Sequence, residues 1–240
     1  MPVSRSPWTC TRTFCQECRR MPRVNSTSCS LCGMTQPMAK EDEPYALQDE
    51  REQLRRLEML SLPHVRPLRD FVERIGRAQH IVPYPDPCDG GIQAKVLLLL
   101  EAPGPRAVES GFISRNNADR TARSMCGLLS KATIPRRHTM LWNIVPWFVG
   151  RDGRIRPVTR ADVQVSFPYL RELVDMLTEL RLIVLMGRKS QSAEGQILQI
   201  VAPHVQQTRT WHPSPRVFAR WPEKEKEIQE LFNSIPERVR

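Results

Sequence analysis

The sequence contains no apolar run that approaches the roughly 20 residues needed to cross a bilayer. Its longest apolar runs are Val96–Leu100 and Leu182–Met186, and its first residues lack the apolar stretch of a signal peptide. Internal repeats and low-complexity tracts are also absent. With 40% hydrophobic residues in a chain of 240, general disorder is excluded as well. We therefore expect a soluble, intracellular and cytoplasmic protein that folds around a core and has no membrane partner.

Acidic residues are scarce relative to basic ones, with 26 Asp and Glu against 36 Lys and Arg, a net charge of +10. Residues 1–40 carry six basic residues and one acidic residue, residues 105–150 carry seven and two, and residues 208–221 carry three and none. Residues 41–104 instead sum to −4. A concentrated positive charge favours polyanionic partners, although a basic protein with no nucleic-acid role can have the same composition.

Five of the seven cysteines lie within the first 32 residues. Four of them form a C-x2-C-x10-C-x2-C array, followed directly by Gly33: Cys15, Cys18, Cys29 and Cys32. Each pair presents two thiolates on one side of a bend, so the two pairs together can close a tetrahedral zinc site. Disulfide pairing and chance clustering are the alternatives, and a reducing cytosol disfavours the first. We predict a small zinc-binding module at residues 1–36.

The remaining chain divides into a linker with two helices at residues 37–79 and an α/β domain at residues 80–240. Helical spacing of apolar residues predicts the two helices at 46–62 and 65–79. Beyond them, strands are expected at 94–100, 139–145, 182–186 and 205–211, and helices at 119–132, 167–180, 189–201 and 222–235. Strands that alternate with helices predict a three-layer α/β/α sandwich with a central parallel sheet of about four strands.

Three polar, proline-bearing segments follow strands of this predicted sheet. The first begins with Glu101, the second with Asn143 and the third with His212. Ligands of such sheets bind at the carboxyl ends of the strands. We therefore expect a carboxylate, an amide and an imidazole to converge on one cleft.

In their order and spacing, these segments resemble the successive motifs of the uracil-DNA glycosylase superfamily. The segments are Leu100-Glu-Ala-Pro-Gly104, Gly111-Phe112, Asn143-Ile-Val-Pro-Trp147 and His212-Pro-Ser-Pro-Arg216. The Glu-Ala-Pro-Gly form is most similar to the branch of that family that carries an iron–sulfur cluster. The resemblance covers roughly residues 80–235 and leaves the cysteine module outside.

The resemblance implies a role for each matching residue. Glu101 would position or activate the water that attacks the sugar, and His212 would hydrogen-bond the departing base. Ala102 would line the base pocket, Phe112 would stack on the flipped base, and Asn143 would read the pyrimidine edge. The chemistry suits these residue types, because breaking an N-glycosidic bond creates an oxocarbenium-like sugar and an anionic base. Asn116 and Asn117 are alternatives to Phe112 as residues of this pocket.

DNA contacts are expected from a loop and from arginines around the cleft. By the same resemblance, the loop that presses into the minor groove consists of Pro213, Ser214, Pro215 and Arg216. Further phosphate contacts are expected from Arg106, Arg115, Arg120, Arg123, Arg136 and Arg137, for which a solvated surface is the alternative role.

We therefore predict a DNA-repair glycosylase whose partner is DNA containing uracil or a related lesion. We expect a monomer, which would be associated with the nucleoid if the source is bacterial. The alternatives are a non-catalytic nucleic-acid-binding protein with the same fold and an enzyme that acts on free nucleotides. Zinc is preferred over an iron–sulfur cluster because the four cysteines lie together before residue 33, whereas the cluster ligands of the related branch are spread along the chain.

Overall fold

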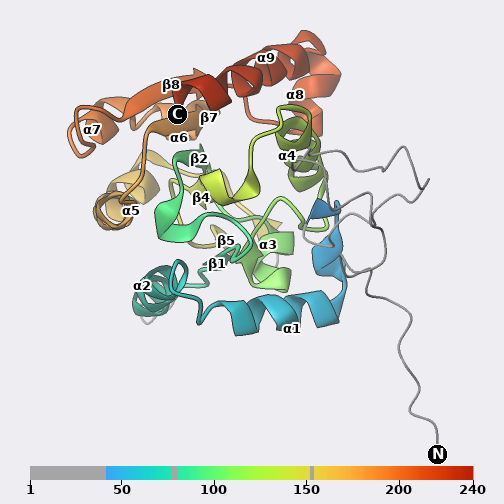
Figure 1. Ribbon diagram of the computed structural model, residues 1–240, viewed down its shortest axis with the longest axis vertical. Coiled ribbons are helices and arrows are strands. Elements are labelled where there is room, and N and C mark those ends of the chain that lie inside the picture. Colours follow the sequence, from blue (N-terminus) through green and yellow to red (C-terminus); the bar gives the residue numbers. More distant parts are fainter. Residues whose placement is uncertain (1–41, 77–79, 152–153, 240) are drawn as a thin grey trace, which may run out of the picture. The chain divides into compact units, whose positions relative to one another are not determined.

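A parallel sheet of four strands in the order β4-β2-β7-β8 forms the centre of the structure (Figure 1). The strands are β2 (Val96–Leu100), β4 (Thr139–Asn143), β7 (Leu182–Met186) and β8 (Gln206–Thr210). This computed structural model describes residues 42–76, 80–151 and 154–239. All of them belong to one compact unit, which spans Lys40–Arg240.

The composition of each strand explains its place in the sheet. All five residues of β2, β4 and β7 are buried, as expected for continuous apolar strands that are covered on both faces. The sequence of β8, Gln-Gln-Thr-Arg-Thr, is polar and partly exposed, which suits its position at the edge. The predicted central sheet of about four parallel strands is confirmed.

Nine α-helices and three 3-10 helices surround the sheet in the described part of the chain. The α-helices are α1 (Glu50–Met59), α2 (Arg66–Gly76), α3 (Pro105–Ser110), α4 (Arg120–Lys131), α5 (Arg160–Met176), α6 (Arg188–Gln191), α7 (Glu194–Leu198), α8 (Pro215–Arg220) and α9 (Glu223–Arg238). The 3-10 helices are η3 (Ala46–Gln48), η4 (Gly91–Gln93) and η5 (Arg136–His138). None of the described helices has the length and apolar character that a bilayer-spanning segment needs.

The two faces of the sheet are covered by different helices, as neighbouring residues of β4 show. The ring of Trp142 contacts Phe71 of α2, with 6.1 Å between the ring centroids. Leu141 points to the other face, where it lines a cavity together with Met125 of α4. Helix α9 packs beside α4, and an ion pair connects α2 with α5. The structure therefore has the three layers that the sequence predicted, α/β/α.

The structure differs from the predicted elements at several points. Helix α5 begins at Arg160 rather than at residue 167, because Thr159 and Asp162 form a capping box there. The helix expected at 189–201 is two short helices, α6 and α7. Helices α3 and α8 were not predicted, nor were two small sheets, which pair β1 (Tyr84–Pro85) with β3 (Phe112–Ile113) and β5 (Gly150–Arg151) with β6 (Arg154–Ile155).

Candidate active site

A cavity of about 350 Å³ lies where β2, β4 and β8 end, and we call it the carboxyl-end cavity. Its polar lining side chains are Arg106, Ser114, Asn117, Asp119, Thr121, Asn143 and His212. The apolar part of the lining includes Ile113, Met125 and Leu141, all of which are buried. A site was predicted at this edge of the sheet, and the cavity has the size of a small-molecule site.

Asn143 enters the cavity from the last position of β4. It is the register partner of Leu100, the last residue of β2, and both side chains line the cavity. Only 4% of Asn143 is exposed. A buried amide that is fixed by a strand offers a donor and an acceptor in defined positions, which is what reading the edge of a base requires.

His212 reaches the cavity two residues after β8. Burial lowers the pKa of this imidazole below its ordinary value of 6.5, so the ring is neutral at pH 7. A neutral ring carries one N–H donor and one acceptor nitrogen. The neighbouring Gly187 has φ +93°, and a Cβ on it would lie 3.1 Å from the Cβ of His212. A side chain at position 187 would therefore be strained and would crowd the imidazole.

Glu101 directly follows β2, but its half-buried side chain is not part of the cavity lining. Its neighbours Leu100 and Ala102 do line the cavity. Of the two positions named from the first motif, Ala102 therefore lines the cavity and Glu101 does not.

The carboxylate that does line the cavity is that of Asp119, which was not singled out from the sequence. Asp119 is the N-cap of α4, where one carboxylate oxygen accepts the N–H of Ala122 at 2.8 Å. Burial raises the pKa of Asp119, and hydrogen bonds from the Ala122 and Thr121 amides partly oppose that rise. The sequence signal is an Asp at the start of an amphipathic helix, which also marks an ordinary helix cap.

Phe112 is fully buried and packs in a small cluster with Leu47, Leu60 and Val65. Its ring is absent from the cavity lining, where the next residue, Ile113, is found instead. Phe112 and Ile113 form the short strand β3, so their side chains point to opposite sides. The prediction that Phe112 stacks on a flipped base is therefore wrong for this structure.

Of the two asparagines that were considered for the pocket, Asn117 lines it and Asn116 does not. The amide of Asn117 is held by Ser110, which donates to it at 2.7 Å, and it donates to the Phe112 carbonyl at 2.8 Å. Asn116 is fully buried and accepts a hydrogen bond from Arg56 at 3.1 Å. Asn117 thus helps to fix the wall of the cavity.

Two arginines that were predicted to contact DNA are instead part of a buried ion-pair network. Arg115 pairs with Asp89 at 3.3 Å and also donates to Thr139, and its side chain is only 5% exposed. Arg136 pairs with Asp86 at 2.7 Å and with Asp89 at 2.9 Å. The network consists of Glu52, Arg56, Asp86, Asp89, Arg115 and Arg136.

This placement corrects the assignment of these two arginines as phosphate contacts, because their guanidinium groups are occupied by buried carboxylates. Arg56, which has no exposed side-chain surface, pairs with Asp86 and Glu52 and thereby ties α1 to the network. Ser114, a cavity-lining residue, donates a hydrogen bond to Asp86. The network therefore supports one wall of the carboxyl-end cavity.

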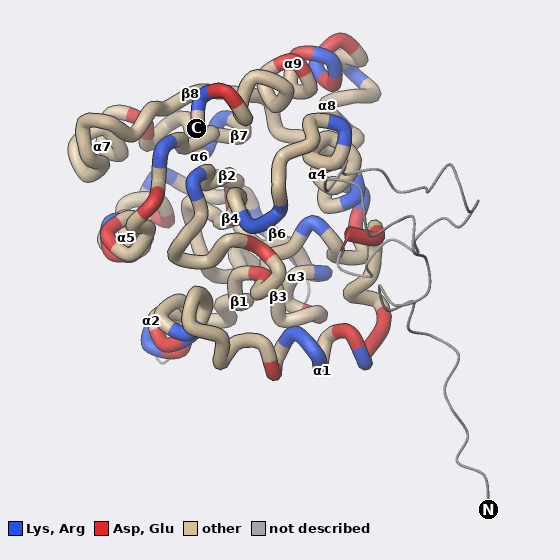
Figure 2. Tube along the Cα trace, viewed as in Figure 1, with Lys and Arg blue, Asp and Glu red and all other residues tan. Residues whose placement is uncertain are grey.

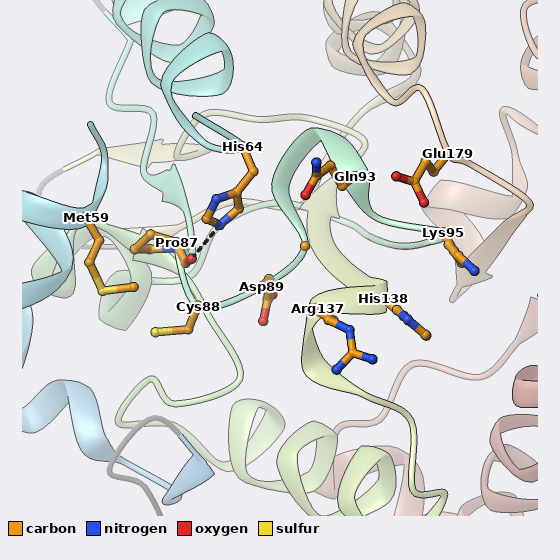
Figure 3. Close-up of a pocket in the computed structure, with 11 residues that line it drawn as sticks. Met59, His64, Pro87, Cys88, Asp89, Gln93, Lys95, Arg137, His138 and Glu179 are labelled. Carbon is orange, nitrogen blue, oxygen red and sulfur yellow. Dashed lines mark hydrogen bonds between the residues drawn. The ribbon is translucent and has the colours of Figure 1, made fainter. Parts of the chain in front are cut away.

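Arg137 is exposed, but it also lies away from the carboxyl-end cavity. It belongs to η5, which directly precedes β4 and so stands at the amino end of that strand. It lines a second cavity, of about 440 Å³, which Figure 3 shows and which we call the amino-end cavity. Arg137 was expected near the carboxyl-end cleft, and the structure places it at the amino-end cavity instead; its contact with DNA stays a prediction.

The predicted DNA-binding loop is in part the start of a helix. Ser214 is the N-cap of α8, where its hydroxyl accepts the Val217 N–H at 3.4 Å, and Pro215 is the first helical residue. Pro213 is buried, whereas Arg216 is exposed. Figure 2 shows the basic positions of α8 and α4 in the same part of the molecule. The other arginines of this region, Arg106, Arg120 and Arg123, are also exposed.

The four cysteines of the predicted zinc site, Cys15, Cys18, Cys29 and Cys32, lie outside the described residues, as does the whole of residues 1–36. Within residues 42–76, 80–151 and 154–239, no group of three or more His, Cys, Asp or Glu side chains is arranged to hold a metal ion. The two described cysteines, Cys88 and Cys126, are not in disulfides.

Comparison with known protein families identifies the family of this chain. The sequence model of the uracil DNA glycosylase superfamily matches residues 87–235, well over half of the chain. The matched range contains all four strands of the central sheet and every residue that lines the carboxyl-end cavity. No curated protein matches the chain.

Proposed function

The chain belongs to the uracil DNA glycosylase superfamily, and from this premise we propose that it hydrolyses the N-glycosidic bond of uracil, or of a related damaged base, in DNA. One observation carries the proposal: a single cavity brings together an amide, an imidazole and a carboxylate, those of Asn143, His212 and Asp119. Breaking this bond leaves positive charge on the sugar and negative charge on the base. The three groups suit these charges and the edge of the base.

Asn143 and His212 are proposed to bind the base. The Asn143 amide presents a donor and an acceptor to the pyrimidine edge from a backbone position that the strand fixes. The neutral imidazole of His212 donates a hydrogen bond to a base oxygen as negative charge develops there. Aliphatic side chains, among them Ile113 and Met125, cover the faces of the base in place of an aromatic ring. A base in a duplex must be flipped out to reach them.

A carboxylate is proposed to orient water and to stabilise the positive sugar, and Asp119 has the position for it. Hydrogen bonds from the Ala122 and Thr121 amides fix this carboxylate in the cavity lining, where it can meet a water molecule. Glu101, assigned to this role by the motif, is not among the lining residues, so we propose that it acts at longer range through its negative charge. Removing Asp119 should therefore slow excision more than removing Glu101.

We propose in addition that residues 1–36 bind one zinc ion through Cys15, Cys18, Cys29 and Cys32. The support is the spacing of the two cysteine pairs, each with two intervening residues. In this proposal, exposed arginines such as Arg106 and Arg216 bind DNA phosphates near the carboxyl-end cavity. The main partner is therefore DNA.

The test is excision from a labelled oligonucleotide that contains one uracil, followed by alkali to cleave abasic sites. Asp119→Asn and His212→Ala should each slow single-turnover excision by roughly 10²–10³-fold, the scale of losing one preorganised electrostatic contact. Glu101→Gln should have a smaller effect. Asp175→Asn removes an exposed carboxylate of α5 that lies outside the cavity lining and serves as the matched control.

Binding of the same oligonucleotide separates an enzyme from a protein that only binds nucleic acid. For an enzyme, the Asp119 and His212 variants should lose rate while DNA affinity falls far less, since the phosphate contacts remain. DNA binding without any excision by the parent protein would support the non-catalytic alternative. An equal loss of affinity and rate would mean that these residues are structural.

A further inference from the structure

Ile155, the last residue of β6, lies at the mouth of the carboxyl-end cavity. It lines this cavity and is at the same time 56% exposed. Among the large apolar residues that are exposed in the described part of the chain, it is the one that lines the carboxyl-end cavity. The other exposed lining residues are Pro105 and Arg106 at the start of α3, so these three residues form the mouth.

The small sheet that carries Ile155 is attached to the domain on both sides. Val149, just before β5, and Val158, shortly after β6, are buried in the hydrophobic core. The Arg156 amide donates to the Val149 carbonyl at 3.1 Å, and the Arg156 guanidinium donates to both carboxylate oxygens of Asp162 in α5, at 2.7 Å each. The backbone that presents Ile155 at the mouth is therefore held in place.

Ile155 contributes little to folding through its own burial. Three other apolar residues of the same lining, Ile113, Met125 and Leu141, are at most 5% exposed, whereas more than half of Ile155 stays in contact with water. An apolar side chain gains free energy only when its surface is removed from water. A partner that enters the mouth of the cavity would cover this surface, so the position suits a binding role.

Double-stranded DNA is the partner that suits this mouth. The inference rests on the proposed function, in which a base leaves the helix and enters the carboxyl-end cavity. Flipping a nucleotide out of a duplex opens a gap between base pairs, and an apolar side chain such as isoleucine can fill it. A free nucleotide or an unpaired strand has no such gap. Arg106 adds an exposed positive charge to the same mouth, which suits the adjoining phosphates.

We propose that the substrate is double-stranded DNA and that Ile155 enters the space left by the flipped nucleotide, where it packs against the neighbouring bases. The contact covers the apolar side chain and keeps the extruded base from returning to the helix. Ile155 belongs to β6 and not to the loop of residues 213–216, to which the sequence resemblance assigned contact with the minor groove. The two segments would therefore meet the DNA separately.

Ile155→Ala removes most of an exposed side chain and should leave the core intact. It should slow single-turnover excision of uracil from a duplex about tenfold, because the unstacked bases lose their apolar contact. Excision from the same strand without its complement should change by less than about twofold, since an unpaired base needs little unstacking. Ile155→Leu keeps the apolar volume and should behave like the parent. Leu198→Ala, which truncates an exposed leucine of α7 that lines neither cavity, is the matched control.

A second measurement does not depend on excision. The duplex carries a fluorescent adenine analogue, which brightens when its stacking is lost, beside a deoxyuridine whose 2′-fluorine blocks hydrolysis. Saturating parent protein should brighten the analogue, and Ile155→Ala should remove most of this signal. If the parent gives the signal but excises no uracil, the proposed function fails and the role of Ile155 stands. The proposal is overturned if the parent gives no signal, if Ile155→Ala gives the same signal, or if Ile155→Ala slows excision equally from single and double strands.

Discussion

Replacing Asp86 by Asn should cost more stability than any single change of an exposed charge in this protein. Asp86 lies at the centre of the buried network, where it accepts hydrogen bonds from Arg56, Arg136 and Ser114 on one oxygen and from the Cys88 amide on the other. Asn removes the negative charge and can place an N–H₂ group against two guanidinium groups. Arg136 keeps Asp89 as an ion-pair partner, and Arg56, which is fully buried, keeps Glu52 as its one remaining carboxylate among the described residues.

The expected loss is about 3–5 kcal/mol, the cost of breaking a buried ion pair by removing one partner. Typical domains have a stability of about 5–15 kcal/mol, so the variant would lose a large share of it. For a domain of this size, the loss corresponds to a fall of about 6–20 °C in Tm. Asp70→Asn breaks an exposed pair with Arg69 at 2.7 Å and should cost at most about 1 kcal/mol.

The effect of Asp86→Asn should also depend on pH. Burial by itself would raise the pKa of Asp86, but Arg136 and Arg56 lower it below the ordinary value of 3.8. A carboxyl whose pKa is lowered in the folded state stabilises the protein above its unfolded pKa and loses this contribution as the pH falls through the folded value. The difference between parent and variant should therefore be full at pH 7 and should shrink below about pH 4.

Urea unfolding followed by tryptophan fluorescence measures these free energies, with Asp70→Asn as the control. A loss below about 1 kcal/mol for Asp86→Asn at pH 7, equal to that of the control, would refute the reasoning. It would mean that the buried network contributes no more than a surface ion pair.

Three further predictions concern the site and the cysteine module. Asn143→Ala should weaken uracil recognition, and Asn143→Asp should shift discrimination between uracil and cytosine. Binding to undamaged DNA should hardly change in either variant. If both variants excise uracil at the parental rate, Asn143 does not read the base. Because the pKa of His212 is lowered, the single-turnover excision rate should stay unchanged as the pH falls to 6.5 and should decline only in more acidic solution. A rate that is already half-maximal at or above pH 6.5 would contradict a neutral imidazole at this position. Elemental analysis should find about one zinc per chain. The Cys15→Ser variant should lose this zinc without unfolding the glycosylase domain. Iron, or no metal, in the parent protein would contradict the zinc site.

The centre of the sheet could be predicted from the sequence because strands buried on both faces are continuous apolar runs. Strand β7 was predicted at residues 182–186 and is found there. The polar edge strand β8 has no such run; it was predicted at 205–211 and spans Gln206–Thr210. Short elements left no such pattern. Helix α3 has six residues, too few to show helical periodicity, and α5 contains Pro168 in its interior, which obscured its first two turns.

The site could be predicted only as far as motif positions determine side-chain direction. Asn143 and His212 were predicted at strand ends, and both line the cavity. Phe112 and Ile113 are adjacent in a strand, so one step along the chain reverses the side chain and brings Ile113 to the cavity in place of Phe112. Arg115 was assigned to the surface because its partner, Asp89, lies 26 residues away in the sequence. Asp119 was overlooked because the same residue caps a helix and faces the cavity.

The central claim is that the carboxyl-end cavity hydrolyses an N-glycosidic bond, and the most direct measurement follows the oxygen of the attacking water. A uracil-containing oligonucleotide would be incubated with the protein in ¹⁸O-labelled water, and the products analysed by mass spectrometry. The account predicts free uracil without the label, together with an abasic strand of unchanged length that carries one ¹⁸O at the sugar. The Asp119→Asn variant should form the same products at a rate roughly 10²–10³-fold lower. Intact uracil-containing DNA after incubation with the parent protein, or label found at a phosphate instead of the sugar, would contradict it.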